Sequence, residues 1–256
     1  MRIGIVGYGR MGRLIHRAAL ARGHEVPVVV DPSGSAPAIT STVLGEDLPQ
    51  VEVVIDFSNP SAVPENVKLY GQMQTSAVIG TTGWYGEMDK VAQIVKRVGI
   101  GVIWSGNFSL GVNLFFQLVR SAGEIINRFD GYDVTIHEMH HHHKVDSPSG
   151  TAEMLGHILL NAVDRKKQVA SAGPNIQPGE EKLLISSARC GSVPGVHQVI
   201  IDGDSDTILL EHSARNREGF ASGAVMAAEW IAGRKGFYNI DDMMQTIIGG
   251  KHNENS

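Results

Sequence analysis

The sequence predicts an α/β protein with two domains. The first is expected to be a doubly wound parallel sheet, and the second an α+β domain with a largely antiparallel or mixed sheet. Up to about residue 108, short apolar runs rich in β-branched residues alternate with helical segments, and glycine-, threonine- and serine-rich turns follow the runs. Beyond that point longer strand-like runs replace this alternation. We therefore expect a domain boundary between residues 108 and 109.

Composition excludes several classes of function. The chain has 256 residues, of which 42% are hydrophobic and 19% charged, as in an ordinary globular protein. Its net charge is -5 without a basic stripe, which argues against nucleic acid as a partner. Cys190 is the single cysteine, so no internal disulfide can form. No apolar run reaches membrane-spanning length, and no signal-like segment precedes the first strand. We expect a cytoplasmic protein with no membrane partner.

The first elements form a strand–helix–strand unit. Residues 2–6 are expected to form a buried parallel strand, and residues 11–22 a helix that Gly23 terminates. A second strand is expected over residues 25–30, with Asp31 directly after it.

A glycine pattern lies between the first strand and the helix. Gly7, Gly9 and Gly12 match G-x-G-x-x-G. Glycines let the backbone approach a pyrophosphate, the helix N-terminus attracts its charge, and an acid about 20 residues further on can accept bonds from a ribose. A glycine-rich turn without a ligand is the alternative, which the complete strand and helix context disfavours. We therefore predict a Rossmann-like dinucleotide site.

The rest of the first domain continues the alternation. Residues 32–50 are expected to be loop, 51–57, 77–79 and 100–104 strands, and about 86–98 a helix. Ligands bind doubly wound sheets at the carboxyl ends of the strands. The expected cofactor contacts are therefore Gly7, Tyr8, Gly9, Arg10, Met11, Gly12, Asp31, Phe57, Gly80, Thr81, Thr82, Ser105, Gly106, Asn107 and Phe108.

The second domain is expected to begin with a long helix over residues 111–128 and a strand over 132–139. Ser147 is expected to cap a helix whose first position is Pro148 and which ends near Asp164. A loop over residues 171–181 and antiparallel strands over 182–188, 196–201 and 206–212 follow, the last two joined by a turn containing Asp202 and Gly203.

Two C-terminal helices are expected over residues 220–232 and 241–248, followed by a frayed tail over 252–256. They could pack back on the first domain. The predicted division is thus 1–108 with 215–256 for dinucleotide binding, and 109–214 for substrate binding and oligomerisation.

A histidine-rich run stands between these elements. Residues 137–146 contain five histidines with a glutamate, a lysine and an aspartate. His137, Glu138 and His141 spell H-E-x-x-H, which would suggest a zinc hydrolase if it lay on a helix. The flanking residues favour a strand, and no third ligand is evident, so we expect no metal.

The favoured chemistry is proton transfer beside a bound anion. His140 and Lys144 have the same parity, so they would share one side of an extended segment, and one could give a proton while the other fixes an anionic group. Ser149, Gly150 and Thr151 at a helix start would add N–H groups and hydroxyls for a carboxylate. His137, His142 and His143 are expected to be structural or solvent-facing.

Over essentially its whole length the chain resembles the dihydrodipicolinate reductase family. The most specific match is EMHHHHKVDSPSGTA at 138–152, similar to the family's E-x-H-H-x-H-K-x-D-x-P-S-G-T-A. Supporting matches are GYGRMGR at 7–13, DFSNP at 56–60, GTTG at 80–83, SGNFSLGVN at 105–113, the R-x-G-x-x-x-G-x-H spacing from Arg189 to His197, and RNREGFASGA at 215–224.

The resemblance implies a specific reaction: a nicotinamide cofactor reduces 4-hydroxy-tetrahydrodipicolinate, by way of dihydrodipicolinate, in lysine and diaminopimelate biosynthesis. Hydride goes to ring C4 and a proton to C3. By resemblance, His140 is the proton donor, Lys144 binds a carboxylate and assists the proton step, and His141, Ser149, Gly150, Thr151 and Arg217 complete the substrate site. A homotetramer is also implied.

Three other functions compete: another nicotinamide-dependent dehydrogenase of an amino-acid pathway, the zinc hydrolase, and a dinucleotide sensor without catalysis. For the reductase, Asp31 favours NADH over NADPH, because an acid there repels a 2′-phosphate and no arginine follows it directly.

Overall fold

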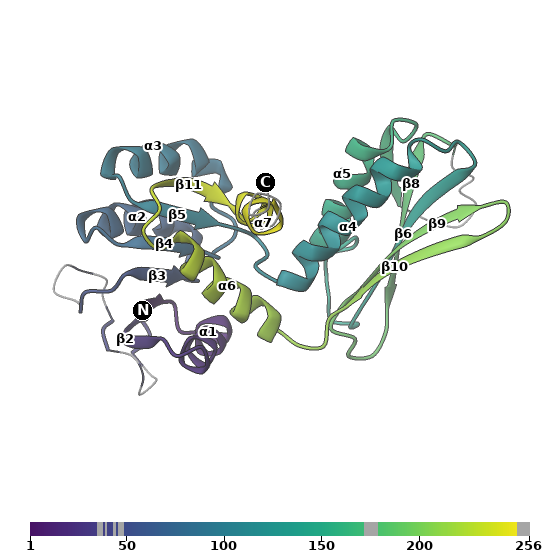
Figure 1. Ribbon diagram of the computed structural model, residues 1–256. Helices are drawn as coiled ribbons and strands as arrows, with labels where there is room; N and C mark the ends of the chain where they lie inside the picture. The colour runs from purple at the N-terminus through teal and green to yellow at the C-terminus, as the bar shows by residue number, and fades with distance from the viewer. Residues whose placement is uncertain (35–37, 39, 43–44, 46–48, 172–178, 250–256) are drawn as a thin grey trace. The chain divides into compact units, whose positions relative to one another are not determined.

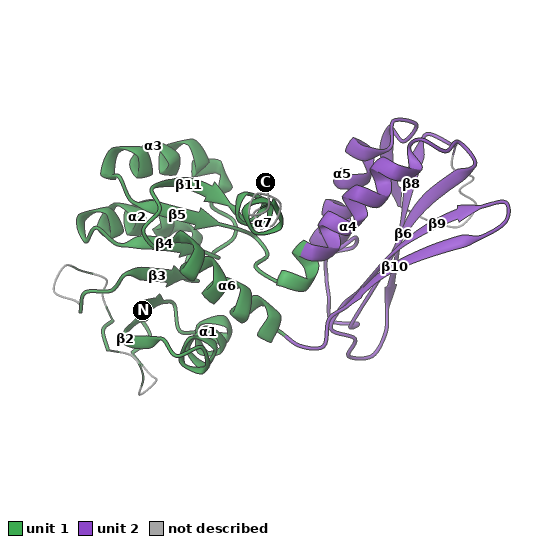
Figure 2. Ribbon diagram, viewed as in Figure 1, with its two compact units in different colours: residues 1–113, 217–256 green, residues 114–216 purple. Residues whose placement is uncertain are grey.

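The computed structural model describes residues 1–34, 38, 40–42, 45, 49–171 and 179–249. The chain forms two compact units, Met1–Asn113 with Arg217–Ser256, and Leu114–Asn216 (Figures 1 and 2). The first junction lies inside a helix, α4 (Leu110–Ile126), and not at residue 108 before it. Asn113 explains this position, because its side-chain amide donates to the carbonyls of Asn107 and Ser109 and so ties the first turn of α4 to the first unit.

The first unit contains a six-stranded sheet in which every pairing is parallel. Its strands are β1 (Arg2–Val6), β2 (Glu25–Val30), β3 (Val53–Asp56), β4 (Ser76–Ile79), β5 (Gly101–Trp104) and β11 (Gly236–Asn239), in the order β11-β5-β4-β3-β1-β2. The central strands β3 and β4 are buried throughout, as expected of strands covered on both faces. The predicted doubly wound sheet is confirmed.

Helices cover both faces of this sheet. α1 (Arg10–Ala21), α6 (Glu218–Ile231) and α7 (Ile240–Gly249) contribute to one apolar core, and α2 (Val63–Gln72) and α3 (Met88–Val98) to the other (Figure 1). Each presents one apolar face; in α3 it is formed by Val91, Ile94 and Val95. Short 3-10 turns, η1 (Pro60–Ala62) and η2 (Tyr85–Glu87), precede α2 and α3.

α6 returns the chain to the first unit and supports its ligand-facing edge. Its alanine-rich face shares a core with Ile3 and Ile5 of β1. At Gly223 the helix approaches the loop after β5 so closely that a Cβ atom would lie 1.8 Å from the carbonyl oxygen of Phe108. Only glycine permits this approach, so α6 fixes the position of that loop.

The second unit contains a five-stranded mixed sheet. Its strands are β6 (Tyr132–His140), β7 (Gln168–Ser171), β8 (Lys182–Arg189), β9 (Val196–Gly203) and β10 (Thr207–Ser213), in the order β10-β9-β6-β8-β7. The remainder of α4 and the helix α5 (Gly150–Ala162) pack together beside the sheet (Figure 2). Val134 and Ile136 of β6 are buried, and residues 138 and 140 continue the same face.

Several local predictions were wrong. β8 runs parallel to β6 and β7, and among the strands described in this sheet β9 alone pairs antiparallel, with β6 and β10. The turn between β9 and β10 comes after Asp202 and Gly203, which belong to β9.

The start of α5 was also misplaced. Ser149, not Ser147, is the N-cap, because its Oγ accepts from the N–H of Ala152 at 3.3 Å; Pro148 therefore precedes the cap and Gly150 is the first helical residue. The elements β7, β11 and α2 were not predicted.

Parts of three predictions fall outside the described residues. These are the tail at 252–256, positions 172–178 of the 171–181 loop, and positions 35–37, 39, 43–44 and 46–48 of the 32–50 loop. Within the described ranges, no helix has the length and apolarity needed to cross a membrane.

Candidate active site

The β1–α1 loop has the close backbone packing that its glycines predict. Gly7 has a φ of 88°, and a Cβ there would lie 2.3 Å from the carbonyl oxygen of Phe57. A Cβ on Gly12 would lie 2.1 Å from the carbonyl oxygen of Gly7, whereas nothing lies within 4 Å of the corresponding position at Gly9. The first and third glycines are thus needed for packing, and the second leaves open space where a ligand can approach the backbone.

Asp31 is fixed against this loop. Its Oδ2 accepts from the backbone N–H of Tyr8 at 2.6 Å and its Oδ1 from that of Ser33 at 2.8 Å. Hydrogen bonds from Ser33 and Tyr8 lower the pKa of Asp31, so the group is an anion at neutral pH. The structure thus places a carboxylate beside the glycine loop.

The N-terminus of α1 is suited to an anion. No side chain caps it, and its first turn carries no acidic residue. A cavity of about 430 Å³ beside it is lined by Gly9, Arg10, Arg13, Leu14 and Arg17. Free N–H groups, the helix dipole and guanidinium groups converge there, as a pyrophosphate requires. These residues fit a dinucleotide, whose chemistry when bound is hydride transfer from its nicotinamide.

The remaining predicted cofactor residues continue along the same edge of the sheet. Phe57 and Phe108 have ring centroids 6.3 Å apart, and Gly80 lies directly against the ring of Phe57. Thr81 is buried, with its hydroxyl 3.3 Å from Oδ1 of Asp56, so its side chain packs inside the protein and ties its loop to the end of β3. Thr82, Ser105, Gly106 and Asn107 stand in the two neighbouring loops; Met11 lies in α1.

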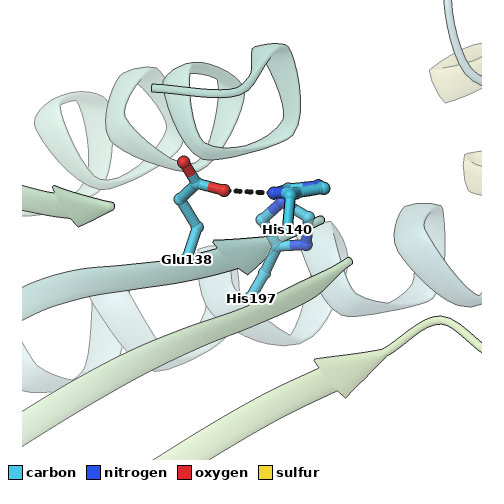
Figure 3. A group of neighbouring side chains, drawn as sticks. All are labelled: Glu138, His140 and His197. Atoms are coloured by element: carbon cyan, nitrogen blue, oxygen red, sulfur yellow. Dashed lines mark hydrogen bonds and ion pairs between the residues drawn. The ribbon is translucent and has the colours of Figure 1, made fainter. Parts of the chain in front are cut away.

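His140, the residue predicted to transfer a proton, lies in the second unit at the end of β6. Glu138 is fully buried and His140 is 7% exposed. Nδ1 of His140 is hydrogen-bonded to Oε2 of Glu138, and Figure 3 shows the two side chains on one side of the strand. The other carboxylate oxygen, Oε1, accepts from Nη1 of Arg189 on β8 at 2.9 Å. Each oxygen of Glu138 therefore has a partner, as a buried carboxylate requires.

Charges around His140 oppose one another. The pKa of His140 is lowered overall: burial is the largest cause, the hydrogen bond and negative charge of Glu138 raise the pKa, and the positive charges of Lys144 and Arg189 lower it further. For Glu138, burial alone would raise the pKa, but hydrogen bonds from Ser187, Arg189 and His140 outweigh it and the pKa is lowered. Glu138 is thus the negative neighbour that favours a charged His140.

A second histidine connects this pair to the start of α5. The rings of His140 and His197, on β9, are 5.1 Å apart and nearly perpendicular (Figure 3). Nε2 of His197 lies 3.0 Å from Oγ of Ser149, the N-cap of α5. Burial, and then the positive charge of His140, lower the pKa of His197 to about 4. His197 is therefore neutral at neutral pH, and it joins His140 to the Ser149–Gly150–Thr151 helix start.

The segment after His140 is a turn that lines a cavity, so the parity argument for Lys144, which assumed an extended strand, was wrong. β6 ends at His140 and a turn follows, in which the N–H of Lys144 donates to the carbonyl of His141 at 3.1 Å. Nζ of Lys144 is 2.7 and 2.8 Å from the two oxygens of Asp146. A cavity of about 410 Å³ is lined by His141, His142, His143, Gly191 and Ser192. Lys144 acts on His140 through its charge rather than by sharing a strand face.

The structure does not form the zinc-protease arrangement. Residues 137–140 are strand, and Nδ1 of His137 lies 2.7 Å from Oγ of Ser186. One ligand atom from each of Glu138, His140 and His197 does lie within 4.8 Å of the others. Both oxygens of Glu138 are already held, however, one by a guanidinium, so a cation would have to displace these bonds beside a positive charge. This set does not fit a resident metal.

Comparison with known proteins decides the family. The model for the N-terminus of dihydrodipicolinate reductase matches residues 1–108, and the model for its C-terminus matches residues 111–244. The chain belongs to the dihydrodipicolinate reductase family. It is 34% identical to the 4-hydroxy-tetrahydrodipicolinate reductase of Christiangramia forsetii, over 97% of this chain and 99% of that one. Identity to the Ralstonia pickettii enzyme of the same name is also 34%, over 95% and 99%.

A solved structure agrees on the fold. The dipicolinate-bound dihydrodipicolinate reductase from Paenisporosarcina sp. TG-14 superposes with a TM-score of 0.79 at 23% identity, covering 95% of this chain and 99% of that one. As a member of this family, the protein is an NAD(P)H-dependent oxidoreductase that reduces 4-hydroxy-tetrahydrodipicolinate in lysine biosynthesis. This assignment decides against the other functions considered from the sequence.

Within this reductase, the structure brings His140 together with Ser149 through His197, and it places His141 and Lys144 in the adjoining turn. Arg217 belongs to the other unit, where it is the N-cap residue of α6. Sequence reasoning missed three contacts of the site, those of Glu138, Arg189 and His197. The contact of Glu138 with His140 could have been predicted, because residues two apart on a strand lie on the same face. The motif from Arg189 to His197 named the other two residues but did not indicate what they contact.

Proposed function

We propose that the ring of the substrate receives hydride at C4 and that His140 supplies the proton at C3. The observation that carries this proposal is the environment of its Nε2. Nδ1 is bonded to Glu138, and Gly195 lies against the opposite nitrogen so closely that a Cβ there would be 2.9 Å from Nε2. Glycine, with a φ of 154°, thus leaves Nε2 uncovered. That nitrogen is the one free to exchange a proton with a ligand.

The step balances in electrons and protons. When bound, a nicotinamide cofactor would supply hydride, which is two electrons and one proton, for a new C–H bond at C4. The electron pair of the double bond moves to C3, where the proton leaving Nε2 forms the second C–H bond. The ring gains two hydrogens, and His140 becomes neutral until it takes a proton from water.

The substrate carboxylates are proposed to bind at the start of α5 and in the turn after β6. Gly150 and Thr151 offer backbone N–H groups in the first helical turn, and Ser149 is the capping residue. His141 lines the neighbouring cavity with a buried Nδ1 that has no hydrogen-bond partner among the described residues, and Lys144 would exchange Asp146 for a substrate carboxylate. Arg217 is proposed as a further carboxylate ligand on the family resemblance alone.

The test is a nicotinamide absorbance assay, with substrate made in situ from pyruvate and aspartate semialdehyde by the preceding synthase. In this assay His140→Gln should lower kcat roughly 10²–10⁴-fold, the range for losing a general acid, with little change in KM. His137→Gln is the matched control, because His137 lies on the same strand and bonds Ser186. A His140→Gln variant that kept half the wild-type kcat would contradict the proposal.

We further propose that the enzyme prefers NADH. The ionised Asp31 beside Tyr8 can accept bonds from ribose hydroxyls and repels a 2′-phosphate, whereas Arg10 and Arg13 near the same loop moderate that repulsion. One charged hydrogen bond gained or lost, ~1–2 kcal/mol, corresponds to roughly 5–30-fold in kcat/KM. Measuring kcat/KM for both cofactors at equal ionic strength tests this, and equal values or a preference for NADPH would refute it. Asp31→Asn should reduce the preference.

A cytoplasmic homotetramer, assembled through the sheet of the second unit, completes the proposal. It is supported by the family resemblance and by the exposed apolar side chains of Ile208 and Leu209 on β10, which is the edge strand of that sheet.

A further inference from the structure

We propose that Glu138, anchored by Arg189, is a positioning residue that fixes which nitrogen of His140 carries the transferable proton and makes the charged ring easier to form for the reaction. This inference rests on the proposed role of His140 as the proton donor. Glu138 itself does not face the substrate: it is fully buried and acts through the histidine.

The hydrogen-bond geometry determines the tautomer. Glu138 and His140 alternate on β6, so their side chains lie on the same face, with Oε2 of Glu138 against Nδ1 of His140 (Figure 3). An ionised carboxylate can only accept, so Nδ1 must carry a hydrogen. A neutral His140 is therefore protonated at Nδ1 and bare at Nε2. The charged ring can then lose its proton only from Nε2, the nitrogen beside Gly195.

Arg189 keeps the carboxylate in this orientation. Its Nη1 donates to Oε1 of Glu138 at 2.9 Å, and its Nη2 donates to the carbonyl of Asp146 at 2.6 Å. β6 and β8 place His140 and Arg189 in register as direct neighbours. Glu138 is thus held at both oxygens, and a rotation that broke its bond to His140 would also break its bond to the guanidinium of Arg189.

The charges around the ring show why a carboxylate is needed. The groups facing His140 are Glu138 on β6, Lys144 in the following turn, Arg189 on β8 and His197 on β9. Lys144 and Arg189 are positive, and burial also disfavours a charged ring. Glu138 is the one negative group among these four. Without it, the ring would release its proton at a still lower pH, and a smaller fraction of the enzyme would carry the proton when the substrate binds.

A purely structural role for Glu138 makes a different prediction. If Glu138 served only as a partner for Arg189, its replacement would lower activity equally at every pH. If it holds the proton on His140, the alkaline limb of the pH–rate profile must move, because a general acid loses activity as pH rises through its pKa. The shape of the profile separates the two roles.

The first experiment measures kcat and kcat/KM against pH for wild type, Glu138→Gln and Glu138→Asp, all as full-length enzyme. Glu138→Gln keeps the shape of the side chain and removes its charge. We expect its alkaline limb to move to lower pH by about 1–3 units, the usual effect of losing an adjacent opposite charge, and Glu138→Asp to restore part of the shift. Glu65→Gln is the matched control, because Glu65 is an exposed carboxylate on α2 that pairs with Lys68.

The second experiment needs no variant at Glu138 and so remains decisive if Glu138→Gln does not fold. The ¹⁵N chemical shifts of the His140 ring in the wild-type enzyme report its tautomer, with the signal identified by its absence in His140→Gln. Neutral His140 should be protonated at Nδ1. A ring protonated at Nε2 would overturn the inference.

The outcomes also separate this inference from the proposed function. A fully active His140→Gln variant would show that His140 is not the proton donor, and the inference about Glu138 would fail with it. An inactive His140→Gln variant, together with a Glu138→Gln profile that has the wild-type midpoint and only a lower kcat, leaves the proton donor in place and overturns the positioning role.

Discussion

Lys144 is paired with Asp146 through both carboxylate oxygens, and it also lowers the pKa of His140. It can therefore affect substrate binding and the proton step at once. We expect Lys144→Ala to raise KM roughly 10–100-fold, the equivalent of one charged hydrogen bond at ~1.5–3 kcal/mol, and to lower kcat as well. Lys144→Arg keeps the charge but changes the geometry, so it should restore binding better than turnover.

Steady-state kinetics with a dipicolinate analogue as competitive inhibitor measure both effects. Lys90→Ala is a matched control, since Lys90 forms a comparable ion pair with Glu87, 2.6 Å away, in the other unit. If Lys144→Ala bound the analogue as tightly as wild type, Lys144 would not contact a carboxylate.

His197 gives the protein a stability that depends on pH. Its pKa is about 4 in the folded chain, against 6.5 for a free histidine, so the unfolded chain binds more protons between these values. The contribution of neutral His197 is complete above about pH 6.5 and is lost as the pH falls towards 4. At about 1.4 kcal/mol per pKa unit, the free energy of unfolding should fall by about 3 kcal/mol over this window because of His197.

Urea unfolding at several pH values, compared between wild type and His197→Gln, isolates this contribution. Glutamine can still bond Ser149 but does not titrate, so the difference between the two proteins should shrink at low pH. A difference that stays constant from pH 7 to pH 4.5 would show that His197 is not buried in its neutral form.

For individual residues, the sequence predicted which residues form the motif but not the contacts between them and the rest of the site. His140 and Lys144 were identified from the histidine-rich run. The contacts of Arg189 and His197 depend on strand register, since these residues lie on β8 and β9, about 50 positions away along the chain. Parity failed for Lys144 because β6 stops at His140, and nothing in four consecutive histidines marks where a strand ends.

At the scale of elements, two glycines of α6 offer a matched comparison. A Cβ on Gly223 would lie 1.8 Å from the carbonyl oxygen of Phe108, whereas one on Gly219 would lie 3.5 Å from Oγ of Ser109, an ordinary contact. Gly223→Ala should therefore push α6 away from the loop after β5 and destabilise the protein by ~1–3 kcal/mol or more. Gly219→Ala should be neutral or stabilise it by up to ~1 kcal/mol.

Thermal unfolding of the two variants measures the change in stability. The KM for the nicotinamide cofactor reports whether the loop after β5 has moved. Gly223→Ala should raise that KM because Phe108 belongs to the expected cofactor edge, and Gly219→Ala should not. Equal unfolding temperatures for the two variants would mean that α6 is not seated on this loop.

Elements with strong patterns were predictable, and weak ones were not. β1, α1 and β2 follow from apolar periodicity and the glycine loop. β11 has four residues of intermediate burial at the edge of its sheet, and β7 is short and mostly exposed, so neither carries a distinctive pattern. The direction of β8 follows from its parallel pairing with β6 and β7, which periodicity does not report.

At the scale of the whole molecule, we expect a mass in solution of about four times the 27.5 kDa subunit, measured by light scattering after size exclusion. Ile208→Lys should reduce this mass, because a charge on the exposed edge strand β10 opposes apolar packing between copies. Leu20→Lys, an equally exposed apolar position on α1, is the control. A wild-type monomer, or a tetramer unaffected by Ile208→Lys, would contradict the proposed assembly.

The discontinuity of the first unit has a consequence for the newborn chain on the ribosome. The strands β1 to β5 emerge first, but α6 and β11, which complete one face and one edge of their sheet, follow only after all of residues 114–216. The continuous second unit can fold as soon as it has left the exit tunnel. During that interval Ile3 and Ile5 lack the α6 side chains that bury them. The incomplete first unit therefore exposes apolar surface, and a chaperone would be expected to bind there.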